Sequence, residues 1–90
     1  MQRVRLIISG DVQGVGFRAW IKGVARKLGL GGFVKNREDG AVEVVAEGER
    51  ESLEILMKEC HDGPEVAFVE KVQVEWEKAT DECMGFEVVY

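Results

Sequence analysis

The sequence predicts an α+β domain built as a two-layer sandwich, with two helices on one face of a mostly antiparallel sheet. Three observations lead to this prediction. Apolar residues alternate in short runs typical of strands, and they recur at helical spacing in two longer segments. The order of these segments is strand, helix, strand, strand, helix, strand, with one further strand at the end. Because two helices can cover only one face of such a sheet, we expect two layers.

The strands are predicted from alternating apolar side chains. In the first strand, Val4, Leu6 and Ile8 fall on one face. Asp39-Gly40 supplies the positive φ that a tight hairpin needs between the second strand and the third. The predicted strands cover residues 3–9, 31–36, 41–47, 67–76 and 86–90.

The two helices are predicted from apolar stripes. The first helix begins near Phe17 or Arg18, and its stripe consists of residues 17, 20, 21, 24, 25 and 28. The stripe of the second helix consists of Leu53, Leu56, Met57 and Cys60. Gly63-Pro64 ends the second helix. Right-handed crossovers place both helices on the same side, which predicts a ferredoxin-like βαββαβ sandwich with a short additional strand.

Length and composition indicate one ordinary globular domain over residues 1–90. The chain is 46% hydrophobic and 32% charged, with a net charge of −5. This acidic balance argues against a nucleic-acid or anionic-membrane surface, which needs a basic patch. The apolar run before Gly10 is too short for a signal peptide or a membrane span. We therefore expect a cytoplasmic protein and, by default, a monomer.

The thiols do not suggest a metal site. Cys60 and Cys83 are too far apart for a CxxC motif, and His61 is the only histidine. Two free thiols are expected in a reducing compartment, with pairing of the two cysteines as the alternative. The sequence thus predicts neither a metal nor a cofactor.

The loop after the first strand, "SGDVQGVGFR" at residues 9–18, has the composition of an anion-binding turn. Its glycines allow backbone N–H groups before the helix to converge, and Arg18 can add a bidentate contact to the same anion. Val12, Val15 and Phe17 are suited to anchor the loop to the core. Taken alone, the stretch is better explained as a plain glycine-rich turn, which is a common feature.

Named phosphate and nucleotide motifs do not fit this loop. No Gly-Lys-Ser/Thr follows Gly16, so the loop is not a Walker A motif, and the third glycine of the dinucleotide fingerprint is missing. Neither Cys60 nor Cys83 lies six residues before an arginine, so the Cys-x5-Arg arrangement of cysteine phosphatases is absent.

Two segments resemble the acylphosphatase family. "GDVQGVGFR" matches its G-x-V-Q-G-V-x-F-R phosphate-binding pattern. "LGLGGFVKNREDGAVEVVAEG" is similar to its second block, L-G-L-x-G-(aromatic)-V-x-N-x-x-D-G-x-V-E-V-x-x-x-G. The resemblance extends over residues 4 to 90, and the family's fold agrees with the predicted order of elements.

The resemblance implies an enzyme that hydrolyses acyl phosphates to carboxylate and inorganic phosphate without a metal. By motif, the phosphate would be held by Gln13, Gly14, Val15, Gly16, Phe17 and Arg18. Arg18 would contribute its side chain and Asn36 would hold the attacking water. Inorganic phosphate would then be a competitive inhibitor. Without the first motif, Asn36 is better explained as a common turn opener.

Two departures from the family pattern bear on this expectation. Asp11 stands where many relatives carry a basic or neutral residue, and an inward carboxylate would repel the substrate. Arg37-Glu38 replaces a frequent Leu-Pro, which would loosen the hairpin that carries Asn36.

Two other functional classes share this order of strands and helices with an acyl phosphate hydrolase. A non-catalytic ferredoxin-like module, like the acylphosphatase-like domains of larger maturation proteins, is the alternative. An RNA-recognition domain shares the strand order, but its third strand needs basic and aromatic residues, which "AVEVVAE" lacks.

Overall fold

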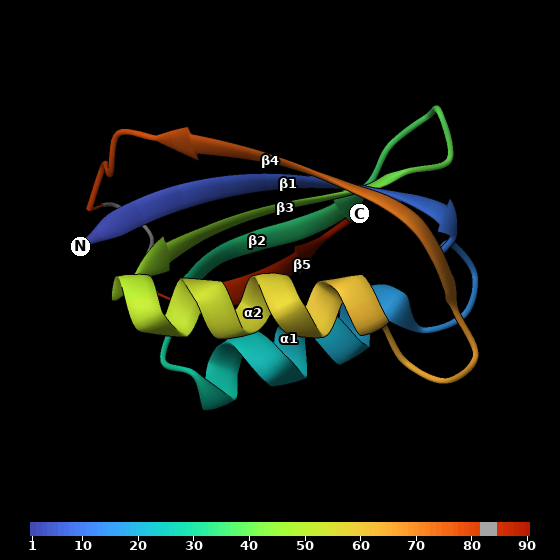
Figure 1. The fold of residues 1–90 in the computed structure, drawn as a ribbon, viewed down its shortest axis with the longest axis horizontal. Helices are drawn as coiled ribbons and strands as arrows, with labels where there is room; N and C mark the ends of the chain where they lie inside the picture. The colour runs from blue at the N-terminus through green and yellow to red at the C-terminus, as the bar shows by residue number, and fades with distance from the viewer. Residues whose placement is uncertain (82–84) are drawn as a thin grey trace.

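Five strands form one sheet, and two helices lie on one of its faces (Figure 1). The computed structural model describes residues 1–81 and 85–90. The strands are β1 (Gln2–Asp11), β2 (Gly31–Asn36), β3 (Val42–Gly48), β4 (Phe68–Glu77) and β5 (Phe86–Val89). The helices are α1 (Phe17–Lys27) and α2 (Arg50–Asp62). The predicted ferredoxin-like order, with its additional final strand, is confirmed.

The strand order, β4-β1-β3-β2-β5, brings three strand ends together. β1 and β2 each pair antiparallel with β3, so they run parallel to one another. β5 pairs parallel with β2, whereas β4 pairs antiparallel with β1. The carboxyl ends of β1, β2 and β5 therefore meet at one end of the sheet. In Figure 1 this is the right-hand end, where the β1–α1 loop, the β2–β3 hairpin and the C-terminus lie.

The core fills the space between the sheet and the helices. The first strand buries Val4, Leu6 and Ile8 completely. Each helix buries the centre of its predicted stripe, namely Phe17, Ile21 and Ala25 in α1 and Leu53, Leu56 and Cys60 in α2. Burying one large aliphatic or aromatic side chain contributes roughly 1.5–3 kcal/mol. This packing holds the first turn of α1 against the end of the sheet.

β1 is longer than predicted. It continues through Gly10 and Asp11, which pair with Val69 and Phe68 of β4, after a register shift between Ser9 and Gly10. A Cβ at residue 10 would lie 2.2 Å from the carbonyl oxygen of Phe68, so only glycine fits this close approach. The sequence predicts that this strand ends at Ser9, whereas Gly10 lies at an irregularity inside the strand.

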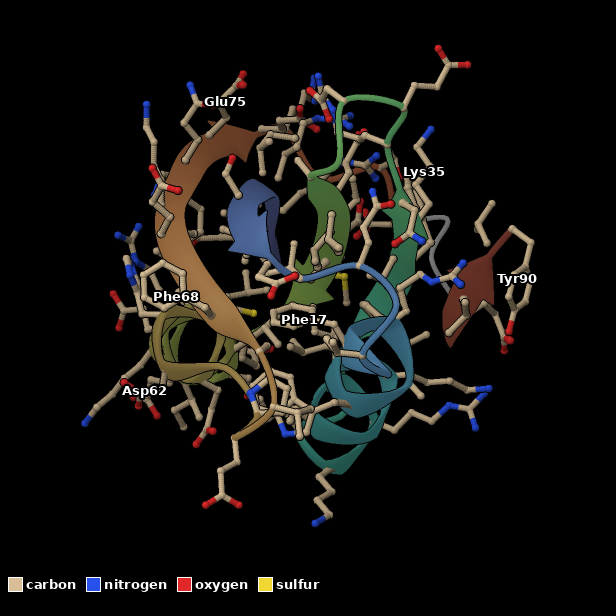
Figure 2. All side chains as sticks on the ribbon, turned by 90° about the vertical axis from the view of Figure 1, so that its right-hand side faces the viewer. Phe17, Lys35, Asp62, Phe68, Glu75 and Tyr90 are labelled. Carbon is tan, nitrogen blue, oxygen red and sulfur yellow. The ribbon has the colours of Figure 1, made fainter. Side chains whose placement is uncertain are left out.

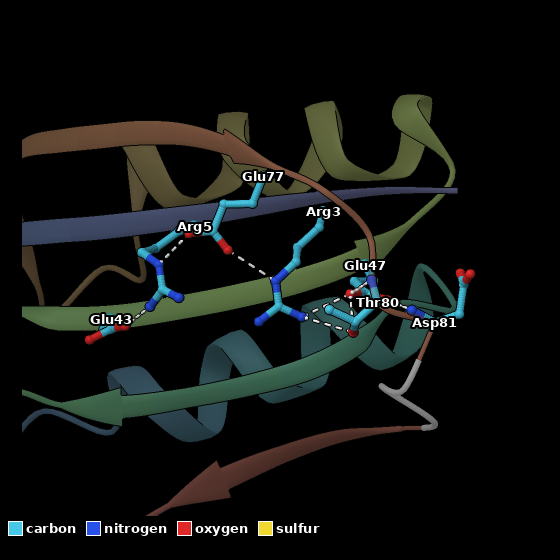
Figure 3. A network of polar contacts seen from close by, with 7 residues as sticks. All are labelled: Arg3, Arg5, Glu43, Glu47, Glu77, Thr80 and Asp81. Carbon is cyan, nitrogen blue, oxygen red and sulfur yellow. Dashed lines mark hydrogen bonds and ion pairs between the residues drawn. The ribbon is translucent and has the colours of Figure 1, made fainter.

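The sheet face opposite the helices carries a network of ion pairs (Figure 3). Arg3 contacts Glu47 through Nη1 at 2.8 Å and Glu77 through Nε at 3.0 Å. Arg5 contacts Glu77 through Nε at 2.7 Å, and it also pairs with Glu43. Because side chains alternate along a strand, Arg3 and Arg5 project away from the core that Val4 and Leu6 enter.

Glu47 ties the segment after β4 to this network. Its buried carboxylate accepts hydrogen bonds from the backbone N–H groups of Thr80, at 2.9 Å, and Asp81, at 3.0 Å. Burial alone would raise the pKa of Glu47. The hydrogen bonds from Thr80, Arg3 and Asp81 outweigh burial and lower this pKa to about 2. The carboxylate thus fixes the chain on its way to β5.

Neither of the two helices that the structure describes is long and apolar enough to cross a membrane.

Candidate active site

The loop between β1 and α1 is fixed at both ends by buried side chains. Val12 and Phe17 are each 1% exposed, and Val15 packs against the same core. Figure 2 shows Phe17 between the sheet and the helices at this end of the molecule. The predicted anchoring is confirmed, and it leaves the backbone between the anchors at the surface.

The backbone of this loop has the geometry of an anion nest. Gly14 and Gly16 have φ values of 77° and 76°, whereas Val15 between them does not have a positive φ. Such alternation points successive N–H groups toward one concave side. A Cβ at either glycine would meet no atom within 4 Å, so backbone conformation rather than crowding favours glycine here.

The beginning of α1 adds donors to the nest. The first hydrogen bond of the helix joins the Trp20 N–H to the Gly16 carbonyl at 3.0 Å. The amides of Phe17, Arg18 and Ala19 precede it and have no acceptor within the helix. The first turn contains no acidic residue. The positive end of the helix dipole is therefore not offset by a local carboxylate, which favours a bound anion.

A cavity of about 140 Å³ lies over this loop. It is lined by Val12, Gly14, Gly16, Phe17, Arg18, Ala19, Asn36, Val88 and Tyr90. Asn36 is the exposed last residue of β2 and reaches the cavity because β2 runs parallel to β1. The structure thus brings together Arg18 and Asn36, which are eighteen residues apart in the sequence. Gln13 and Val15 do not contribute to this lining.

Arg18 is held from one side by the end of the chain. Its Cζ lies 4.7 Å from the centroid of the Tyr90 ring, and its Nη1 donates to the Val89 carbonyl at 3.4 Å. Figure 2 shows Tyr90 at the margin of the molecule beside β5. Within residues 1–81 and 85–90, Arg18 forms no ion pair with a carboxylate. Its positive charge is therefore oriented without being neutralised.

The side chain of Gln13 points toward the β2–β3 hairpin. Its Nε2 lies 2.9 Å from the carbonyl oxygen of Arg37 and 2.9 Å from that of Ala41. The family resemblance places Gln13 among the phosphate-binding residues, and it does not predict this contact. With the side chain engaged, the backbone N–H is the group that Gln13 can offer to the nest.

The two departures from the family pattern are accommodated. Asp11 is exposed, pairs with Phe68 at the end of β1, and is not among the described residues that line the cavity. Arg37 forms an ion pair with Asp39 at 3.1 Å, and its N–H donates to the Ala41 carbonyl at 2.8 Å. These contacts close the hairpin that was expected to be loose.

Tyr90 is a site residue that the sequence interpretation missed. The strand predicted for residues 86–90 contained the signal, because side chains alternate along a strand and Tyr90 therefore falls on the same face as Phe86. The missing information was the parallel pairing of β5 with β2, in which Lys35 lies opposite Val89. One step further along both strands, Asn36 and Tyr90 reach the same cavity.

Cys60 has a structural role. It is fully buried, and burial, with a smaller effect of neighbouring Glu59, raises the pKa of its thiol to about 12. Cys83 lies outside the described residues, so the pairing of the two cysteines stays a prediction. In the part of the chain that the structure describes, no three His, Cys, Asp or Glu side chains are grouped to hold a metal ion.

The fold and the site define a small α+β sandwich that presents an arginine-flanked anion nest at one end of its sheet. The sequence model of the acylphosphatase family matches residues 4–88. The chain belongs to the acylphosphatase family of enzymes. The resemblance stated from its motifs is therefore confirmed.

Individual relatives agree over the full length of the chain. An acylphosphatase from Roseiflexus sp. is 48% identical over 90 residues, covering 100% of this chain and 97% of the relative. The crystal structure of acylphosphatase from Bacillus subtilis superposes with a TM-score of 0.96 at 37% identity, covering all of both chains. Full-length HypF contains a similar segment, with a TM-score of 0.88 and 28% identity. That segment corresponds to 99% of this chain but only 12% of HypF.

Proposed function

We propose that this chain hydrolyses the carboxyl–phosphate bond of acyl phosphates, with the phosphoryl group held by the backbone of residues 13–18 and by Arg18. Asn36 orients the attacking water. One observation carries the proposal: a single cavity is lined by the nest glycines Gly14 and Gly16, by Arg18 and by Asn36.

The nest and Arg18 stabilise negative charge on the phosphoryl oxygens. In phosphoryl transfer this charge is spread over the three equatorial oxygens, so catalysis depends mainly on positioning and electrostatic stabilisation. Val12 and Phe17 are buried and anchor the loop, so the amides at the start of α1 are already positioned before the substrate binds. Arg18 adds a planar pair of donors, already turned by its contact with Tyr90.

Asn36 has the chemistry to hold a water without ionising it. Its carboxamide oxygen accepts a hydrogen bond from water and its N–H₂ group donates one. The water oxygen forms a new bond to phosphorus as the bond between phosphorus and the acyl oxygen breaks. The electron pair of that bond leaves with the carboxylate. The proton lost by the water passes to a phosphoryl oxygen, so the proposal needs no protein base.

The proposal requires only one chain, because a single protomer supplies the residues that line the cavity. We accordingly propose a monomer as the active unit, with the cytoplasm as its location. Size-exclusion chromatography with light scattering tests the monomer.

Metal-free hydrolysis of benzoyl phosphate is the direct test. We expect release of one carboxylate and one phosphate per turnover, with inorganic phosphate as a competitive inhibitor. Uncompetitive or absent inhibition by phosphate would contradict the nest as the binding site. A well-folded protein that turns over neither benzoyl phosphate nor acetyl phosphate would favour the non-catalytic module instead.

A further inference from the structure

We infer that Gln13 is a positioning residue that fixes Asn36 relative to the phosphate nest. The inference rests on the proposed function, because it assigns to Asn36 the role of holding water. It concerns the side chain of Gln13 and adds to the phosphate contact proposed for the backbone N–H of the same residue. In this interpretation the side chain of Gln13 connects two parts of the site without touching the substrate.

The side chain of Gln13 donates to both ends of one turn. Its Nε2 carries two hydrogens and lies 2.9 Å from each of two carbonyl oxygens, those of Arg37 and Ala41. Both donors of the amide are therefore used within the protein. Such a bidentate contact constrains distance and orientation together, whereas a single hydrogen bond leaves rotation free.

Hydrogen bonds within residues 37–41 close the turn that Gln13 contacts. The Arg37 N–H donates to the Ala41 carbonyl at 2.8 Å, and the Gly40 N–H donates to the Arg37 carbonyl at 3.3 Å. The Ala41 N–H donates to Oδ1 of Asp39 at 3.1 Å. Residues 37–41 thus form one hydrogen-bonded unit, and Gln13 is attached to it at two points.

Asn36 is joined directly to this unit. It precedes Arg37 in the chain and pairs with Val42, which follows Ala41. Asn36 is exposed at the end of β2, so little packing fixes its position. A displacement of the turn is therefore transmitted to Asn36, whereas the nest stays attached to the core through Val12 and Phe17.

The topology explains why such a connection is needed. β1 and β2 are separated by β3, so no ladder hydrogen bond joins the ends from which the nest and Asn36 arise. The contact from Gln13 crosses this gap at the level of the loops. A displacement of about 1 Å between a reacting atom and its activating group can lower a rate about a hundredfold.

The test separates positioning from binding. Gln13→Met removes both donors without adding charge, and Gln13→Asn keeps the amide but shortens its reach. We expect both variants to lower kcat about tenfold or more, while the inhibition constant for inorganic phosphate changes less than about twofold. Gln73→Met is the matched control, because Gln73 is exposed on the edge strand β4 and should leave both constants unchanged.

A double-mutant cycle identifies Asn36 as the residue that is positioned. In an Asn36→Ala background, Gln13→Met should cause no further loss of kcat. Additive losses would overturn the inference, as would weaker phosphate binding with an unchanged kcat. If Gln13→Met does not fold, the milder Gln13→Asn variant decides by the same two measurements. Failure of the proposed function is distinguished separately, since it would appear as normal kcat in Asn36→Ala alone.

Discussion

The guanidinium of Arg18 lies over the ring of Tyr90, with its Cζ 4.7 Å from the ring centroid. The carbonyl oxygen of neighbouring Val89 accepts a hydrogen bond from Nη1 at 3.4 Å. Arginine in the first turn of a helix is disfavoured by the dipole, by roughly 0.3–1 kcal/mol. The contacts with Tyr90 and Val89 act against this cost and hold the side chain beside the cavity that it lines.

Removing the ring should weaken phosphate binding. A cation–π contact at an exposed site contributes about 0.5–1 kcal/mol, so Tyr90→Ala should raise the inhibition constant of phosphate about two- to fivefold. Tyr90→Phe keeps the ring and serves as the control, with a constant close to that of the unmodified protein. Equal effects of the two variants would show that the hydroxyl, and not the ring, matters.

Arg18 should contribute to both binding and turnover. Arg18→Ala is expected to raise the inhibition constant of phosphate and to lower kcat/KM about a hundredfold or more, because a charged donor pair is lost. Arg18→Lys should recover only part of the loss, since an ammonium cannot reproduce the planar fork. Steady-state kinetics with benzoyl phosphate measures both. Unchanged phosphate inhibition in Arg18→Ala would contradict its assigned role.

Asn36 should act on turnover alone. We expect Asn36→Ala to lower kcat about a hundredfold or more, while phosphate inhibition stays within about twofold of the unmodified protein. The reason is that the nest and Arg18 hold phosphate without the carboxamide. Circular dichroism and thermal unfolding provide the control for folding. Normal turnover in this variant would remove the water-positioning role.

Acid should destabilise the protein through Glu47. Its pKa is about 2 in the folded chain and 4.5 ordinarily, so folding favours the charged form. The resulting stabilisation is fully present above about pH 4.5 and is lost as the pH falls toward 2. Its size is on the order of 3 kcal/mol, since one pKa unit corresponds to about 1.4 kcal/mol.

Urea unfolding between pH 2 and 7 measures this dependence. In Glu47→Gln, the free energy of unfolding at neutral pH should be lower and its decline with acid should be shallower. The matched control is Glu75→Gln, because Glu75 is exposed on β4. In this control the free energy of unfolding should decline with acid as steeply as in the unmodified protein. If the free energy of unfolding declined with acid equally in Glu47→Gln and in the unmodified protein, Glu47 would not be the source of the acid sensitivity.

Removal of metal ions should leave turnover unchanged. The residues proposed to act on the substrate are an arginine, an asparagine and backbone amides, and none of them needs a metal. Dialysis against EDTA followed by assay in metal-free buffer is expected to give full activity. A loss of activity that added Mg²⁺ or Zn²⁺ restores would contradict the prediction.

The sequence predicted what depends on local pattern. The stripes of α1 and α2 are buried as expected, and Gly40 in the predicted hairpin has a φ of 91°. The nest glycines and the anchors Val12 and Phe17 also lie as predicted. Each of these features follows from spacing within a few residues, where backbone conformation and burial leave few alternatives.

Features that depend on contacts across the sheet were not predicted. The contact of Tyr90 with Arg18 requires the parallel register of β5 on β2. The burial of Glu47 depends on partners as distant as Arg3 and Thr80. Asn36 and Arg18 were paired only through the family resemblance, because the spacing of residues along the chain does not show which side chains share a cavity.

The placement of β5 also has a consequence for how the site assembles when the chain folds. Arg18 and its carbonyl partner on Val89 are separated by 71 positions in the chain. The backbone turn at Gly14 and Gly16 depends on residues close in the sequence, whereas the orientation of Arg18 depends on the docking of β5 beside β2. Tight phosphate binding is therefore expected to appear only after β5 has docked, and its appearance would time that step of folding.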